Sequence, residues 1–207
     1  MPISLGVVMD PITTLNYAKD STLAMLYAAQ ARNWVIYYCT SQQLYLRDGR
    51  VYGQVQMLHL HTQRRAWYTL TEAREIPLDS LDIILMRKDP PLNLEYFYAT
   101  QLLEFAERAG VLVVNRPQAL RDANEKLYAL QFAQCCPPTL VTADPARLRD
   151  FCAEQGDIIL KPLDAMGGRG IFRLRPQDVN LNALLETATE WGHKTVMAQK
   201  FIREIRD

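Results

Sequence analysis

The sequence predicts an α/β protein built from two domains, residues 1–120 and 121–207. Short apolar runs alternate with segments of helical periodicity, a pattern that is typical of α/β folds. The length of 207 residues lies between one and two ordinary domains. The pattern changes character after Leu120, which is where we expect the first domain to end.

The composition excludes several classes of protein. With 23 Lys+Arg against 23 Asp+Glu, the chain lacks the basic excess of a protein that coats nucleic-acid phosphates. No stretch approaches the roughly 18 apolar residues that a membrane helix needs, and the first residues lack the basic start of a signal peptide. We therefore expect a cytoplasmic protein with reduced thiols. The cysteines are Cys39, Cys135, Cys136 and Cys152.

The first domain is expected to form an open, mostly parallel sheet covered by helices. Its apolar runs indicate buried strands at Ile3–Met9, Trp34–Cys39, Leu81–Met86 and Val111–Val114. Asp20 can cap a helix after the first strand, and Leu92–Ala109 has the apolar spacing of a second helix, which Gly110 closes. Leu44–His61 has the pattern of a hairpin with its turn at Asp48-Gly49.

The second domain mixes shorter helices and strands. Helices are predicted at Asn124–Gln134, Pro145–Gln155 and Leu181–Trp191. Extended segments are predicted at Thr139–Val141, Asp157–Leu163, Ile171–Leu174 and Thr195–Gln199. We expect these elements to form a small α+β domain.

A glycine-containing loop, Asp164–Gly170, is the most informative stretch of the sequence. It follows a buried strand that ends in Lys161, and it contains Gly167 and Gly168. Glycine lets backbone N–H groups approach phosphate oxygens closely, and a lysine adds a point charge. The GxxxxGK[ST] spacing of a Walker loop is absent. The alternative is a hairpin turn in which the glycines serve only the backbone geometry.

Two further segments are candidates for the same site. Lys126 lies at the start of a predicted helix, where a positive charge is used better by an anion than by the helix dipole; a solvated surface lysine is the alternative. The strand near Gln199 could offer backbone groups to a purine, with apolar walls from Met197, Phe201 and Ile202. Those apolar residues could equally be core.

The first domain offers weaker candidates. Arg87 follows a strand end, where ligands of open α/β sheets gather, and its guanidinium could hold a substrate carboxylate. A structural ion pair with Asp89 is equally consistent with the sequence. Asp10 is expected to cap a turn. His59 and His61 alternate onto one strand face but lack an evident third metal ligand, so we expect no metal site there.

Several motifs, taken in order along the whole chain, resemble bacterial glutathione synthetase, an ATP-grasp ligase. They are MDP (Met9–Pro11), ILMRKDPP (Ile84–Pro91), VNRPQALRDANEKL (Val114–Leu127), DIILKPLDAMGGRGIFR (Asp157–Arg173) and MAQKFI (Met197–Ile202). The resemblance implies a Rossmann-like substrate and oligomerisation domain, residues 1–120, followed by the central lid domain of an ATP-grasp fold. It also implies ATP, Mg²⁺, γ-glutamylcysteine and glycine as ligands, and assembly into homo-oligomers.

The resemblance also implies roles for individual residues. Lys126 and Lys161 correspond to phosphate-contacting lysines, and Met166, Gly167 and Gly168 to the loop that covers the nucleotide. The adenine side is formed by Gln199, Lys200, Phe201 and Ile202. The family loop commonly has glycine before the methionine, where this sequence has Ala165. We expect the alanine to stiffen the loop and to change its closing rate.

The expected magnesium ligands of the family lie in a C-terminal ATP-grasp domain, beyond Asp207. We therefore expect the 207-residue chain to have no ligase activity alone while keeping some nucleotide affinity. Two alternatives stay open at this point. One is a different ATP-grasp carboxylate–amine ligase that shares the lysines and the loop, and the other is a non-catalytic binding or assembly module.

Overall fold

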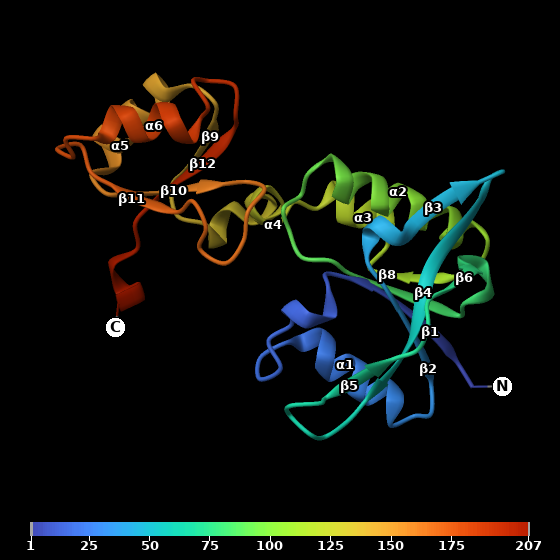
Figure 1. Cartoon of the computed structure of the whole chain (residues 1–207). Helices are drawn as coiled ribbons and strands as arrows, with labels where there is room; N and C mark the ends of the chain where they lie inside the picture. Colours follow the sequence, from blue (N-terminus) through green and yellow to red (C-terminus); the bar gives the residue numbers. More distant parts are fainter. Residues whose placement is uncertain (1, 207) are drawn as a thin grey trace. The chain divides into compact units, whose positions relative to one another are not determined.

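The computed structural model describes residues 2–206 and divides into two compact units between Asp122 and Ala123 (Figure 1). The first unit is built on an eight-stranded sheet and the second on a four-stranded sheet. No helix within the described part of the chain is long and apolar enough to cross a membrane.

The first sheet has the strand order β3-β4-β2-β1-β7-β8, and β5 and β6 also pair with β4. The strands are β1 (Ser4–Met9), β2 (Val35–Cys39), β3 (Leu44–Arg47), β4 (Arg50–Leu60), β5 (Tyr68–Leu70), β6 (Arg74–Pro77), β7 (Ile83–Arg87) and β8 (Leu112–Val114). The helices of this unit are α1 (Ser21–Gln30), α2 (Leu94–Arg108) and α3 (Pro117–Asp122). Short 3₁₀ turns, η1 (Ile12–Thr14), η2 (Ser41–Gln43) and η3 (Leu78–Ser80), join some of these elements.

The sheet is mixed, so the prediction of a mostly parallel sheet is wrong in its extent. Among the described residues of this sheet, only the pairs β1–β2, β1–β7 and β7–β8 are parallel. The long strand β4 pairs antiparallel with β2, β3, β5 and β6. The predicted hairpin is confirmed, because Asp48 and Gly49 take φ angles of 51° and 78° between β3 and β4. Such paired positive φ angles match the twist of the flanking strands.

The alternation of side chains along β1 divides the core of the first unit in two. Val8 packs with Leu103 of α2 on one face, whereas Val7 packs with Leu26 of α1 on the other. Figure 1 shows α2 and α1 on opposite sides of the sheet. The predicted cap of α1 is confirmed, since the Asp20 carboxylate accepts a hydrogen bond of 3.0 Å from Leu23 N–H.

The second sheet has the order β11-β10-β12-β9, and all its pairs are antiparallel. Its strands are β9 (Thr139–Thr142), β10 (Ile158–Pro162), β11 (Phe172–Leu174) and β12 (Val196–Lys200). Helices α5 (Pro145–Gln155) and α6 (Leu181–Ala188) cover one face. Their side chains Leu148 and Leu185 pack with Ile158 and Leu160 of β10. Because side chains alternate along a strand, Ile159 and Lys161 belong to the opposite face.

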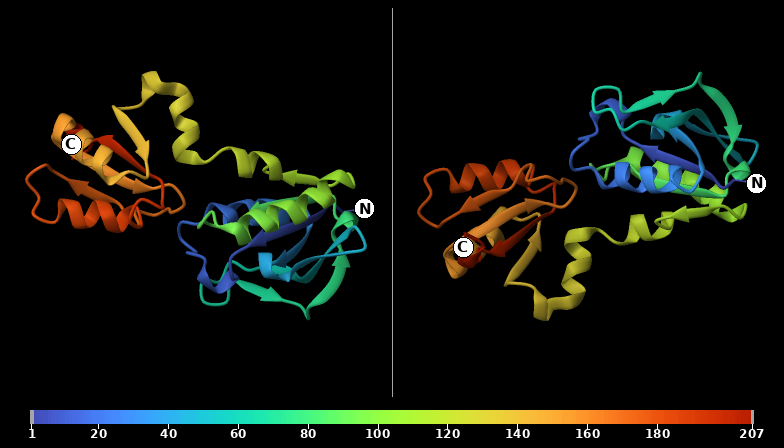
Figure 2. Two further views of the ribbon diagram at one scale, coloured as in Figure 1. Left: turned by 90° about the horizontal axis from the view of Figure 1, so that it is seen from above. Right: turned by 90° about the horizontal axis from the view of Figure 1, so that it is seen from below.

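The segment before β9 differs from the single helix predicted at Asn124–Gln134. It forms α4 (Glu125–Tyr128) and then the 3₁₀ segment η4 (Ala129–Cys135), which Phe132 interrupts with φ −113° and ψ 54°. Figure 2 shows the chain turning between the two pieces (yellow). The predicted helix Leu181–Trp191 also ends earlier, at Ala188, because Glu190 and Trp191 take positive φ angles. The final turn is η5 (Arg203–Arg206).

Candidate functional site

The face of the second sheet opposite α5 and α6, called the open face below, brings Lys161 and Gln199 into contact. Gln199 of β12 lies opposite Ile159 of β10, so Lys161, two residues further on, is its diagonal neighbour on the same face. The Lys161 Nζ donates a hydrogen bond of 2.7 Å to Gln199 Oε1. Two residues that are 38 positions apart in sequence therefore form one polar pair.

The Lys161 ammonium lies in an unfavourable environment for a positive charge. Partial burial lowers its pKa below the usual lysine value, and the charge of Lys126 lowers the pKa further. The partner at Gln199 is a neutral amide, which orients the ammonium without neutralising it. An anion placed beside Lys161 would therefore gain a charge-assisted hydrogen bond and relieve the repulsion between the two lysines.

Lys126 contacts the base of the glycine-containing loop. Its Nζ donates to Ala165 O at 2.8 Å and pairs with Glu125 Oε1 at 2.8 Å. Asn124, which caps α4, donates a second hydrogen bond of 2.9 Å from Nδ2 to Leu163 O. The short helix thus places Lys126 beside the loop and fixes the loop carbonyls on that side.

The tip of the loop has a backbone that requires glycine. Gly167 and Gly168 have φ angles of 65° and 78°, and a Cβ on either would meet nothing within 4 Å. The requirement is therefore conformational and not one of space. Met166 is exposed beside them. Lys194, in the segment between α6 and β12, holds the loop at Asp164 with an ion pair of 3.2 Å.

The strand end after Gln199 is held by contacts that the sequence analysis missed. Lys200 N–H donates to Pro138 O at 2.9 Å, and Phe201 N–H donates to Asp157 O at 2.8 Å. The Arg173 guanidinium lies 3.9 Å from the centroid of the Phe201 ring. Its Nε also donates to the Asp157 carboxylate at 2.9 Å, and this guanidinium holds the pKa of Asp157 below the usual range.

Asp157 and Arg173 are the two ends of the segment Asp157–Arg173 that carries part of the resemblance, but the sequence analysis assigned no role to either residue. A further signal for Arg173 was its place in the strand alternation, because Arg173 lies opposite Ile159 and shares the open face with Lys161. The three apolar residues that were predicted to line the purine site differ in exposure. Met197 is buried at 2% exposure, Phe201 is half-buried, and Ile202 is exposed at 50%. Only the latter two are accessible at this surface.

In the first unit, Arg87 contacts the start of α1. Its Nε donates to Thr22 Oγ1 at 2.9 Å and its Nη2 to Ser21 Oγ at 3.1 Å. Both hydroxyls are neutral, so they orient the guanidinium without compensating its charge. The Asp10 carboxylate contacts the segment after β7 and not a neighbouring turn as predicted, since it pairs with Lys88 Nζ at 3.0 Å and accepts from Asp89 N–H at 2.7 Å.

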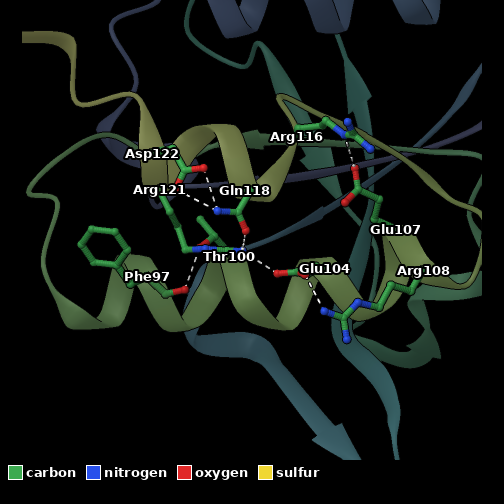
Figure 3. Close-up of polar contacts among 9 residues, drawn as sticks. All are labelled: Phe97, Thr100, Glu104, Glu107, Arg108, Arg116, Gln118, Arg121 and Asp122. Carbon is green, nitrogen blue, oxygen red and sulfur yellow. Dashed lines mark hydrogen bonds and ion pairs between the residues drawn. The ribbon is translucent and has the colours of Figure 1, made fainter. Parts of the chain in front are cut away.

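A polar cluster fixes the chain just before the second unit. Arg121 of α3 contacts Glu104 and Thr100 of α2 with Nη2–Oε2 and Nη1–Oγ1 distances of 2.5 and 3.3 Å (Figure 3). Arg108 reaches the other oxygen of Glu104 at 2.6 Å. The two guanidinium groups, Arg121 first, lower the pKa of Glu104. Arg121 therefore serves the packing of α3 within the first unit.

The histidines provide no metal centre among residues 2–206. His59 is exposed, and His61 lies beyond the end of β4 with its Nε2 3.1 Å from Thr69 Oγ1. No group of three or more His, Cys, Asp or Glu side chains in this described range is placed to hold a metal ion.

Comparison with known proteins gives consistent matches over both units. Residues 3–121 match the family model "Prokaryotic glutathione synthetase, N-terminal domain", and residues 125–207 match "Prokaryotic glutathione synthetase, ATP-grasp domain". Glutathione synthetase from Pseudomonas aeruginosa is 53% identical over 207 residues, which is 100% of this chain and 65% of that protein. The chain thus spans about two thirds, or 65%, of the length of such relatives.

Solved structures show the same fold at low sequence identity. A RimK domain ATP-grasp protein from Sphaerobacter thermophilus has a TM-score of 0.60 at 18% identity, covering 96% of this chain and 64% of that one. The ATP-grasp ligase PsnB, complexed with a phosphomimetic variant of its minimal precursor, Mg and ADP, has a TM-score of 0.54 at 20% identity. That comparison covers 97% of this chain and 65% of PsnB.

Proposed function

This chain belongs to the prokaryotic glutathione synthetase family, and we propose that it takes part in the ATP-dependent joining of γ-glutamylcysteine to glycine. The observation that carries the proposal is that Lys161 pairs with Gln199 on the open face of the second sheet while Lys126 contacts the glycine-containing loop. We propose that this face binds ATP. Phosphoryl transfer depends mainly on positioning and on neutralising charge, for which lysines and oriented amides are suited.

The triphosphate is proposed to lie between the two lysines and the loop. Lys161 would exchange the neutral Gln199 oxygen for phosphate oxygens, and Lys126 would exchange the Ala165 carbonyl for them. The exposed backbone of Met166, Gly167 and Gly168 would supply N–H donors as the loop covers the nucleotide. The lowered pKa of Lys161 supports this arrangement, because an anion is the missing partner.

The purine is proposed to lie against the end of β12. The N–H groups of Lys200 and Phe201 are already bonded to Pro138 and Asp157, so they are unavailable to a ligand. Polar contacts to the base would therefore come from the Gln199 side chain, from carbonyl groups and from donors after Phe201. The Phe201 ring and the exposed Ile202 would supply apolar contact.

Arg87 is proposed to hold the carboxylate of γ-glutamylcysteine that does not react. In the proposed reaction the cysteinyl carboxylate attacks the γ-phosphorus of ATP and ADP leaves. The glycine amine then attacks the acyl carbon, phosphate leaves, the amine loses a proton and the amide forms. Among the described residues, Arg87 donates to two neutral hydroxyl groups, and a guanidinium binds a carboxylate through two parallel hydrogen bonds.

Magnesium, which the family resemblance implies, needs several oxygen ligands. Because residues 2–206 hold no acidic cluster placed for a metal ion, they do not fit a complete magnesium site. We assign no step of the reaction to it. The proposed location is the cytoplasm, in keeping with a requirement for ATP and with the free thiols of Cys39 and Cys152.

Calorimetric titration of the chain with ATP and with γ-glutamylcysteine tests the proposal. We expect saturable binding of both ligands. Lys126→Met should weaken the binding of ATP alone, and Arg87→Met should weaken the binding of γ-glutamylcysteine alone. D-alanine serves as the competing acid, and preference for it over γ-glutamylcysteine would indicate a different carboxylate–amine ligase. Absence of any ATP binding would overturn the nucleotide site.

A further inference from the structure

A continuous chain of hydrogen bonds runs from a backbone carbonyl to the proposed phosphate lysine. Thr139 Oγ1 donates to Pro137 O at 2.7 Å, and Gln199 Nε2 donates to Thr139 Oγ1 at 3.1 Å. Gln199 Oε1 then accepts from Lys161 Nζ at 2.7 Å. Thr139 and Gln199 are cross-strand partners of β9 and β12, so the contact is built into the register of the sheet.

The direction of each bond follows from the chemistry of its ends. The Pro137 carbonyl can only accept, so the single hydroxyl proton of Thr139 points to it. Thr139 Oγ1 can then only accept from Gln199, which turns the NH₂ group of the carboxamide toward Thr139. The Lys161 ammonium can only donate, and it therefore faces the carboxamide oxygen. A flipped Gln199 would oppose acceptor to acceptor at one end and donor to donor at the other.

We propose that Thr139 is a positioning residue that fixes the Gln199 carboxamide with its oxygen toward the ligand, and so makes the site prefer a 6-amino purine over a 6-oxo purine. The proposal rests on the ATP site proposed above. An adenine presents an N–H donor at position 6, which matches the Gln199 oxygen. Hypoxanthine and guanine present an oxygen there, which would face another acceptor.

Thr139 gains importance once the nucleotide binds. The phosphates would draw Lys161 away from Gln199, because a charged partner replaces a neutral one. The hydroxyl of Thr139 then remains as the partner that holds the carboxamide orientation. Without it, Gln199 can rotate and offer its NH₂ group to a 6-oxo purine.

The test compares binding of ATP and ITP, which share ribose and triphosphate and differ in the purine ring at position 6 and in the proton that ITP carries on N1. Thr139→Val removes the hydroxyl at nearly constant volume, and Thr139→Ser retains it. Thr142→Val is the matched control. It lies on the same strand, but its Oγ1 contacts Asp144 N–H and its position alternates to the helix-covered face. Affinities are measured by calorimetry on the whole chain.

We expect Thr139→Val to lower the ratio of ATP to ITP affinity about tenfold, the scale of one hydrogen bond that changes from matched to opposed. Thr139→Ser and Thr142→Val should keep the wild-type ratio. The proposal is overturned if Thr139→Val binds ATP and keeps that ratio within about twofold. Wild-type chain that binds neither nucleotide would instead contradict the ATP site itself.

A ligand-free measurement examines the orientation directly. The side-chain ¹⁵N–H₂ resonances of Gln199, assigned by their loss in Gln199→Glu, should shift and exchange faster with solvent in Thr139→Val, and Thr139→Ser should restore them. Unchanged resonances in Thr139→Val would refute the positioning role even if ATP binding were absent.

Discussion

Replacing Lys161 by Met is expected to weaken ATP binding about 10- to 100-fold and to abolish the dependence of that binding on alkaline pH. The structure gives the reason. Lys161 is partly buried beside a second lysine, and its only hydrogen-bond acceptor among the described contacts is the neutral Gln199 oxygen. A charge-assisted hydrogen bond to phosphate is worth about 1.5–3 kcal/mol net, which corresponds to this range of affinity.

The sign of the pH effect follows from the lowered pKa of Lys161 in the free protein. Phosphate oxygens beside the ammonium would raise that pKa in the complex, so binding takes up a proton when the pH lies between the two values. Affinity is therefore constant below the free-state pKa and falls as the pH rises through it, by up to about tenfold per pH unit. The fall ends at the pKa of the complex.

The assay is calorimetry in two buffers of different ionisation enthalpy, above about pH 8, where ATP itself no longer titrates because its terminal phosphate ionises near pH 6. The difference in heat between the buffers measures the proton uptake. Lys161→Met should remove the uptake, whereas Lys19→Met, an exposed lysine of the first unit, should retain it. Equal proton uptake in wild type and Lys161→Met would refute the reasoning.

Three further perturbations test the packing around the site and the proposed self-association. Asp157→Asn should destabilise the second unit by about 1 kcal/mol, as for a solvent-screened pair. Because the Arg173 guanidinium lowers the pKa of Asp157, that stability is present above the unfolded-state pKa near 3.9 and is lost as the pH falls through the folded-state pKa. The free energy of unfolding of the variant, measured in urea, should therefore fall less steeply at acid pH than that of the wild type. Arg121→Ala should lower the free energy of unfolding in urea by about 1–2 kcal/mol, since the Arg121 side chain is only 13% exposed in its ion pair. Arg108→Ala should lower it by less than about 0.5 kcal/mol, since the Arg108 side chain is 69% exposed. Equal losses would contradict the packing role of Arg121. Leu112→Asp should lower the mass measured by light scattering if the wild-type chain self-associates, because Leu112 is 58% exposed and lines an apolar hollow of about 360 Å³; an unchanged oligomer would place the contact elsewhere.

Local signals predicted most elements of the fold. The buried run of β1, the Asp20 cap and the Asp48-Gly49 turn each act within a few residues, so the sequence displays them. The strands β5 and β6 were missed because each is only three or four residues long, and both exist through antiparallel pairing with the distant strand β4. The single helix expected at Asn124–Gln134 failed at Phe132, whose backbone is non-helical.

The sequence singles out some residues of the proposed site, whereas others are brought to it only by strand pairing. Lys161 and the glycines are visible in the sequence, and a resemblance to known proteins assigns them together. The sequence analysis assigned no role to Thr139 or to Arg173, although Arg173 ends one of the segments that carry the resemblance. The contacts behind their proposed roles arise from the register that sets Thr139 beside Gln199 and Arg173 opposite Ile159.

The same alternation that builds the core of the second unit also builds its polar face. Along β10, Ile158 and Leu160 are at most 1% exposed and pack against the two helices. The alternate positions Ile159 and Lys161 lie on the other face of the sheet. A slip of one residue in the pairing of β10 would bury the Lys161 ammonium among apolar side chains and expose Leu160. The cost of burying an unpaired charge is far larger than that of losing a single hydrogen bond. The hydrophobic core therefore specifies the register, and the register in turn places Lys161 within reach of Gln199 and Gln199 within reach of Thr139.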